Sequence, residues 1–162
     1  MRPLIRALFF GVLSVTAGCG AGDAAPSISD REFSSAADDL CSERLPPLRA
    51  DISDDAPREP AEVAPTVAAR AESLDALVGE LRQLPIRSAA RPEVDAWLAD
   101  WDDYIDVGRR YSEALKQGDP QGYSSVAEEG EVPQARISAF ARANGLTSCA
   151  LDGVPLPPRE GL

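Results

Sequence analysis

The segment 92–117 constrains the fold most strongly, because its apolar side chains recur at helical spacing along its whole length. In a helix, apolar and aromatic residues would lie on one side and charged residues on the other. The apolar set is Val94, Trp97, Leu98, Trp101, Tyr104, Ile105, Gly108, Tyr111 and Leu115, and the charged set is Asp95, Asp102, Asp103, Asp106, Arg109, Arg110 and Glu113. A long amphipathic helix of this kind needs partners that cover its apolar face.

A first helix precedes this segment. Ser29 and Glu32 have the spacing of a capping box, which predicts that the helix begins there. Pro46 and Pro47 lack the backbone N–H that a helix interior needs, so we expect the helix to end at this pair. Phe33 and later apolar residues recur on one face of it.

Helical signals also occur on both sides of the central segment. A second helix is predicted from Ala61 or Pro65 to Leu84, since its apolar residues recur every three or four positions. After Asp119-Pro120, a helix start signal, one or two helices follow with a break within 130–133. The segment Asn144-Gly145-Leu146 has the pattern of a Schellman ending.

No stretch alternates at strand period over a useful length, so the predicted fold class is all-α. Four or five helices with short connections predict an antiparallel bundle over residues 29–152. Residues 19–28 are mostly small and predict a flexible tether. The proline-rich residues 153–162 predict a loose C-terminal tail.

Residues 1–18 have the organisation of a secretory signal peptide, with a basic start and an apolar run too short to span a membrane. The segment Thr16-Ala17-Gly18-Cys19 resembles the lipobox of bacterial lipoproteins. This resemblance implies cleavage after Gly18 and a diacylglyceryl group on Cys19. Two long acyl chains would then hold the protein at a membrane. The alternative is ordinary secretion without a lipid.

The remaining cysteines form an even number. With Cys19 assigned to the lipid, Cys41 and Cys149 remain in an oxidising compartment, which predicts a disulfide between them. The bond would close a loop of roughly 100 residues and stabilise the fold by about 4.7 kcal/mol in the chain-entropy model. The alternative is a pair of free thiols. No C-x-x-C motif supports a redox role.

The composition argues against several classes of function. The net charge of the chain is −11, and it becomes −13 when Arg2 and Arg6 are removed with the signal peptide. An acidic protein of this kind is not expected to bind nucleic acid or to adhere electrostatically to anionic lipid. The chain contains no His, which removes the Ser-His-Asp and Cys-His arrangements and the commonest transition-metal ligand. We therefore expect no cofactor and no enzymatic activity.

The aromatic residues of the 92–117 segment are one candidate for a binding site. Trp101, Tyr104 and Tyr111 could wall a small pocket with Gly108 as its floor. Aromatic residues at helical spacing are, however, more typical of a packed core. Glycine is unfavourable inside a helix, so Gly108 indicates room for a bulky neighbour such as Phe140 or a close helix crossing.

The acidic run that begins at Asp100 is a second candidate. It does not match an EF-hand loop, because the fifth, sixth and twelfth positions lack the required residues. Asp95, Asp102 and Asp106 would share one face of a helix, where a weak surface Ca²⁺ site is conceivable. A solvated face with arginine partners is the simpler interpretation of these spacings.

Three short segments resemble a group of small uncharacterised secreted proteins and lipoproteins of actinobacteria. They are Asp39-Leu40-Cys41, the segment 94–98 and the segment 144–149. The resemblance implies a helical bundle tied by a disulfide and brings no activity with it.

The sequence thus predicts a lipid-anchored, extracytoplasmic helical bundle that acts as a non-enzymatic interaction module of the cell envelope. Its expected contacts are the membrane, through Cys19, and an envelope protein. The alternative is a small-ligand or metal-binding lipoprotein. Such a protein would use the Trp101, Tyr104 and Tyr111 stripe or the aspartate face.

Overall fold

A computed structural model describes residues 27–50 and 59–152. Within these ranges the chain forms five α-helices, one 3₁₀ helix and no strand, which confirms the all-α prediction. The helices are α1 (Arg31–Ala50), α2 (Pro60–Leu81), α3 (Arg91–Gln117), α4 (Pro120–Glu129), α5 (Glu131–Ala143) and η1 (Thr147–Cys149). The predicted signal peptide 1–18, Cys19, most of the tether and the tail 153–162 lie outside the described residues.

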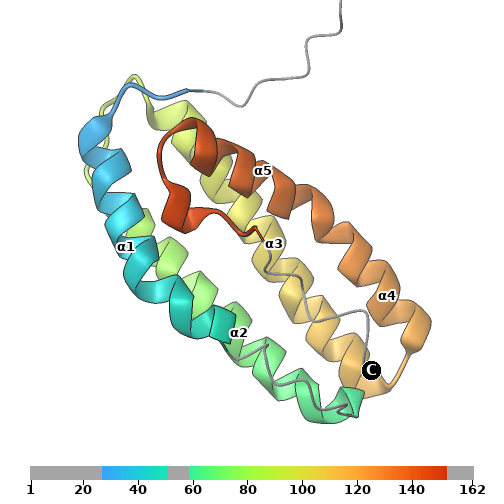
Figure 1. The fold of residues 1–162 in the computed structure, drawn as a ribbon. Coiled ribbons are helices and arrows are strands. Elements are labelled where there is room, and N and C mark those ends of the chain that lie inside the picture. The colour runs from blue at the N-terminus through green and yellow to red at the C-terminus, as the bar shows by residue number, and fades with distance from the viewer. Residues whose placement is uncertain (1–26, 51–58, 153–162) are drawn as a thin grey trace, which may run out of the picture.

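The central element is α3, which contacts α2, α4 and α5 (Figure 1). The two longest helices, α2 and α3, lie side by side and run in opposite directions (Figure 1). All nine residues predicted for the apolar face of α3 are buried. Val107 and Ser112 are buried as well, because α3 is covered from more than one side. The Ser112 hydroxyl donates to the Ala64 carbonyl at 2.8 Å, so this buried polar group is paired.

The boundaries around α3 and α5 agree with the sequence signals. Gly118, with φ of 62°, ends α3, and α4 then begins with Pro120 at its first position. Gly130 separates α4 from α5, as predicted for this stretch. At the end of α5 the Leu146 N–H donates to the Ala141 carbonyl at 2.8 Å, and Gly145 has φ of 72°. This pattern confirms the Schellman ending.

The predicted start of the first helix is wrong in its capping residue. Asp30, not Ser29, caps α1, because the Phe33 N–H donates to the Asp30 carboxylate at 3.2 Å. The predicted end is also wrong, since α1 continues through Pro46 and Pro47 to Ala50. Proline removes a hydrogen bond from a helix interior, but its fixed φ is helical. Burial of the neighbouring Leu45 against the core favours continuation of the helix.

The second helix also differs from the prediction at its ends. It begins at Pro60 and ends at Leu81, three residues before the predicted Leu84. The 82–84 segment forms turns in which the Leu84 N–H donates to the Leu81 carbonyl. Leu84 remains partly buried against the core, so its apolar character fits the helical pattern although it lies outside the helix.

The core has two parts. The larger cluster joins α1, α2, α3, α5 and the segment after α5, and the smaller one joins the start of α2, the end of α3 and α4. Trp97 lies at the centre of the aromatic contacts in the larger cluster. Its ring is stacked on Phe140 at a centroid distance of 5.1 Å and meets Phe33 and Trp101 edge-on.

The disulfide between Cys41 and Cys149 is present, which confirms the predicted pairing. Both cysteines are fully buried. The bond joins α1 to η1, and therefore connects an early helix to the segment that follows the last one. Because α1 continues to Ala50, Cys41 lies inside the helix and not at its end.

Candidate functional site

The predicted aromatic pocket residues all lie in the core. Trp101 is 0% exposed, Tyr104 and Tyr111 are each 2% exposed, and Gly108 is buried. Trp101 and Tyr104 belong to the larger cluster, whereas Tyr111 belongs to the smaller one. The structure therefore divides the stripe between two packed regions, and this arrangement favours the core interpretation over the pocket.

The position of Gly108 has a packing explanation. A Cβ atom built on Gly108 would lie 3.6 Å from the Cβ of Ala71, which is ordinary contact between α3 and α2. Phe140, the other predicted neighbour, stacks on Trp97. The contact between α2 and α3 therefore surrounds Gly108 in place of a pocket, and it leaves room for a methyl group.

The buried tyrosines do not offer an activated phenol. Burial raises the pKa of Tyr104 above its usual value, and the charge of Arg70 opposes this only in part. Burial also raises the pKa of Tyr111, and the nearby Tyr123 adds to the effect. Both side chains therefore stay protonated at neutral pH, which suits core residues and not nucleophiles.

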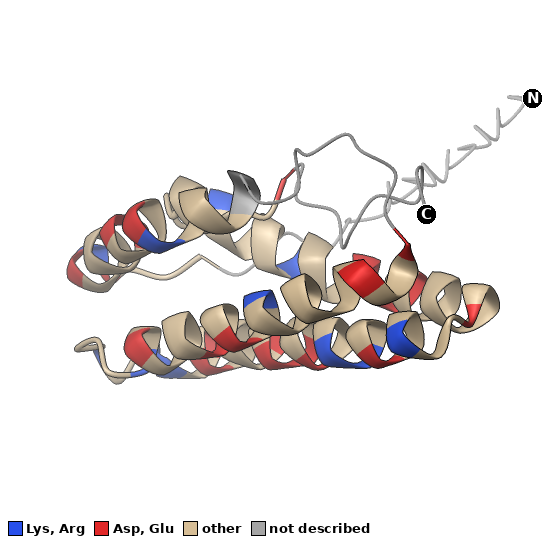
Figure 2. Cartoon of the chain, turned by 90° about the horizontal axis from the view of Figure 1, so that it is seen from below, with Lys and Arg blue, Asp and Glu red and all other residues tan. Residues whose placement is uncertain are grey.

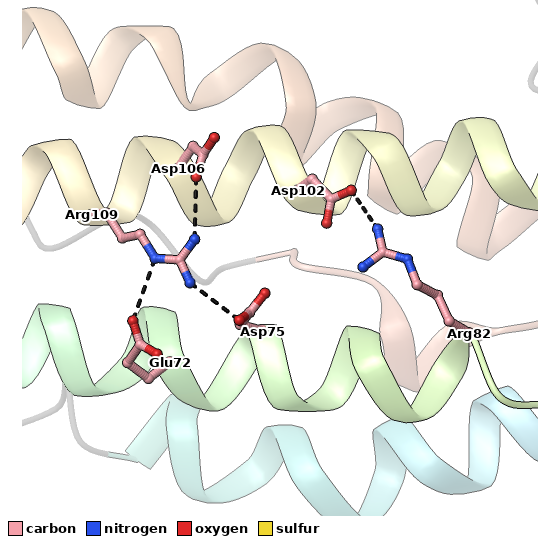
Figure 3. Close-up of polar contacts among 6 residues, drawn as sticks. All are labelled: Glu72, Asp75, Arg82, Asp102, Asp106 and Arg109. Carbon is pink, nitrogen blue, oxygen red and sulfur yellow. Dashed lines mark hydrogen bonds and ion pairs between the residues drawn. The ribbon is translucent and has the colours of Figure 1, made fainter.

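Two residues of the predicted aspartate face, Asp102 and Asp106, lie in an interhelical charge network (Figure 3). Asp102 pairs with Arg82, and Asp106 accepts from Arg109 at 3.3 Å. Arg109 also reaches two carboxylates of α2, Asp75 at 3.2 Å and Glu72 at 3.4 Å. Along the α2–α3 seam the carboxylates are thus paired with arginines, three of them with Arg109, as the simpler sequence interpretation predicts.

The same network raises the pKa of Arg109 above its usual value. Burial would lower the pKa of this guanidinium, but the hydrogen bond with Asp106 and the charges of Asp75 and Glu72 raise it. The side chains in the network are between two-fifths and seven-tenths exposed, so each pair contributes little to stability.

A metal site on this face has no structural support. The described part of the chain contains no group of three or more His, Cys, Asp or Glu side chains that could hold a metal ion. Asp95, the third residue of the predicted face, instead lines a groove of about 360 Å³. The other walls of this groove include Phe33, Leu98 and Asp102.

A second groove, of about 570 Å³, lies where α4 meets α2 and α3. Its charged walls include Glu72, Arg109 and Glu113. Both grooves are within the size range of small-molecule sites, but such sites usually have predominantly apolar walls. The 570 Å³ groove combines apolar walls, such as Ala68 and Val126, with charged side chains from both α2 and α3.

Two aspartates with shifted pKa values were not predicted as site residues. Asp30 is 2% exposed, and its carboxylate accepts from the Arg87 N–H at 2.7 Å. This hydrogen bond lowers the pKa of Asp30 despite the opposing effect of burial, and the bond from Phe33 lowers it further. The capping pattern could have identified Asp30, but its partner is 57 residues away in the chain.

Asp100 has the opposite shift. Burial raises its pKa, although the charge of Arg136 at 3.5 Å lowers it in part. Arg136 belongs to α5, so this pair connects α3 with α5. The sequence places Asp100 in an acidic run without indicating that it is less exposed than its neighbours.

No protein-family model, curated protein or solved structure matches this chain. The described helices include none that is both long enough and apolar enough to cross a membrane. Any function must therefore be argued from the residues themselves.

Proposed function

We propose that this protein is a lipid-anchored, extracytoplasmic antiparallel helical bundle that binds a protein of the cell envelope and catalyses no reaction. The observation that carries the proposal is the Cys41–Cys149 disulfide. Structural disulfides are typical of oxidising compartments. The disulfide also accounts for two of the three cysteines, which leaves Cys19 as the thiol for the acyl group.

The character of the surface supports an interaction role. The aromatic residues predicted to wall a pocket are core residues, whereas acidic residues occur along the exterior of the helices (Figure 2). Val132 is the one large apolar side chain that is exposed among the described residues. Recognition by this surface would therefore depend on charge, and a partner with basic residues is the complement.

Crosslinking in intact cells tests this proposal, and the composition decides the reagent. The chain has a single lysine, Lys116, which pairs with Glu113, so amine-reactive crosslinkers would label it poorly. A carbodiimide instead couples the many carboxylates of this protein to lysines of a partner. We expect one envelope protein to be enriched, with crosslinked peptides that map to the acidic helix surfaces.

The control is a Cys19→Ala variant, which the proposed processing cannot acylate. We expect this variant to leave the membrane fraction and to lose the crosslinked partner. Recovery of no protein above background from the native membrane would contradict the interaction role. Retention of Cys19→Ala in the membrane would contradict the lipid anchor.

The second candidate function is the binding of a small ligand in the groove between Phe33 and Asp102. The observation in its favour is a depression that combines apolar walls with Asp95, Arg91 and the Arg82–Asp102 pair. Thermal denaturation with Ca²⁺ and with apolar ligands tests it, since a bound ligand raises the melting temperature. An unchanged melting temperature with all of them would contradict this alternative.

A further inference from the structure

The N-terminal residues are held at one end of the described domain. The Ile28 N–H donates to the Asn144 side-chain oxygen at 2.6 Å, and the Arg87 N–H donates to the Asp30 carboxylate at 2.7 Å. The start of α1 therefore lies beside the α2–α3 connection and the end of α5 (Figure 1). Ile28, the last residue of the predicted tether, is partly buried here, so the tether enters the domain at this end.

This end carries exposed arginines. The 82–92 segment contains Arg82, Arg87 and Arg91 and no acidic residue, in a chain of net charge −11. Arg82 pairs with Asp102. The Arg87 side chain is 71% exposed, and its guanidinium lies 4.0 Å from the buried Asp30. Arg87 therefore presents most of its side chain to solvent.

Arg31 and Arg91 also contribute positive charge at this end. Arg31 and Arg91 are exposed, and neither forms an ion pair with another residue of the described ranges. The nearest acidic neighbours in sequence are Glu32 and the buried Asp30, on either side of Arg31, and Glu93, which is partly buried. Arg31, Arg87 and Arg91 are named here the arginine end.

An acidic segment lies toward the opposite end. The segment 118–131, which runs from the end of α3 through α4 to the first residue of α5, includes four acidic residues and no basic one, although Lys116 precedes it and Arg110 pairs with Glu129. The acidic residues are Asp119, Glu128, Glu129 and Glu131. The domain therefore has a charge difference between its two ends, although its overall charge is negative.

We propose that the arginine end faces the membrane and that Arg31, Arg87 and Arg91 contact anionic lipid headgroups. The inference rests on the proposed lipid anchor. Ser27 is eight residues after Cys19, and an extended chain covers at most about 3.6 Å per residue, so the tether can bring this end to the headgroups. Repulsion of the acidic 118–131 end from the same surface favours the same orientation.

The orientation leaves α4 and the acidic end accessible to an envelope partner, away from the bilayer. It also explains how an acidic protein can lie against an anionic membrane. The overall repulsion is screened beyond roughly 8 Å at physiological ionic strength, whereas arginines at the contact lie within that distance of the lipid charges.

Hydrogen exchange on vesicles tests the orientation without depending on acylation in the cell. Residues 19–162, which include every described residue, are coupled through the Cys19 thiol to a maleimide phospholipid, while Cys41 and Cys149 stay in their disulfide. The coupled protein is measured on vesicles of phosphatidylcholine alone and of phosphatidylcholine mixed with phosphatidylglycerol. Peptides covering 82–92 and 118–131 report the two ends.

On the anionic vesicles we expect amide hydrogen exchange within 82–92 to slow by about tenfold. Each arginine near an anionic surface raises the membrane affinity by about fivefold, and the neighbouring acidic residues lower the combined effect. Exchange within 118–131 should not change. The Arg87→Gln/Arg91→Gln variant should lose the protection. The control Arg110→Gln/Arg136→Gln removes the same charge from exposed arginines elsewhere and should retain it.

The proposed orientation would be overturned if amide exchange within 82–92 were equal on both vesicle types. It would also be overturned if the anionic vesicles protected 118–131 and not 82–92. Full protection in Arg87→Gln/Arg91→Gln would also overturn it. The mass of the N-terminal peptide from cells answers the separate question of the natural anchor. An unacylated Cys19 would contradict the proposed function, while the vesicle result would still decide the orientation.

Discussion

Removal of the disulfide should cost this domain a large part of its stability. In Cys41→Ala/Cys149→Ala the crosslink between residues 108 positions apart is lost. The chain-entropy model gives about 4.7 kcal/mol for a loop of roughly this length, because the unfolded chain regains that freedom. Domains of this size are stable by about 5–15 kcal/mol, so the variant should be close to its unfolding threshold at room temperature.

Equilibrium unfolding in urea measures this loss. Trp97 and Trp101 are buried in the core, so their fluorescence reports the transition. We expect a lower free energy of unfolding and a larger dependence on urea, since the unfolded variant exposes more surface than the crosslinked chain. The wild-type protein with a reductant is the matched control, because it loses the bond but keeps both sulfur atoms.

A loss below about 1 kcal/mol in both the variant and the reduced protein would contradict the reasoning. It would mean that α1 and the segment after α5 stay associated when the rest of the chain unfolds. A large loss in the variant alone would assign the effect to the cavity left by the missing sulfur atoms and not to the crosslink.

Further predictions concern single residues. Gly108→Ala should raise the free energy of unfolding, measured in urea, by about 0.5–1 kcal/mol, because the new Cβ meets α2 only at contact distance. The control is Gly79→Ala, where the new Cβ lies in open space. A destabilised Gly108→Ala would contradict this packing. The lowered pKa of Asp30 stabilises the fold above the unfolded-state pKa near 4, and this contribution is lost as pH falls through the folded pKa. Acid titration of stability should therefore show a weaker acid dependence in Asp30→Asn, and an identical profile would contradict the role of the Arg87 hydrogen bond. Trp101→Ala should lower the free energy of unfolding by about 3–5 kcal/mol. Trp101→Phe should lower it clearly less, since the indole N–H of Trp101 has no hydrogen-bond partner among the described residues and nothing polar is lost. Equal losses for the two variants in thermal unfolding would contradict this expectation.

Helical periodicity predicts most of the described fold. The 92–117 pattern identifies the buried face of α3, since residues at this spacing must lie on one side of a helix. Helix ends were predicted correctly where a local rule decides them, as at Asn144-Gly145-Leu146 and at the break within 130–133. The prediction at Pro46-Pro47 is wrong because packing of the surrounding helix against the core outweighs the lost hydrogen bonds.

The candidate site was harder to predict, because it depends on contacts between distant residues. An aromatic stripe on one helix has the same spacing whether it lines a pocket or a core, and the choice depends on what covers it. The role of Asp30 depends on the Arg87 N–H, which no local pattern contains. Likewise, Arg109 meets Glu72 and Asp75 only because α2 packs beside α3.

The mass of the mature N-terminus tests whether this protein is a membrane-anchored module. The full-length chain is expressed in a bacterium that processes lipoproteins, and its N-terminal peptide is extracted from the membrane fraction and measured by mass spectrometry. We predict a peptide that begins at Cys19 and carries a diacylglyceryl group. A peptide that begins at another residue, or an unmodified Cys19 in the soluble fraction, would contradict the anchor and the function built on it.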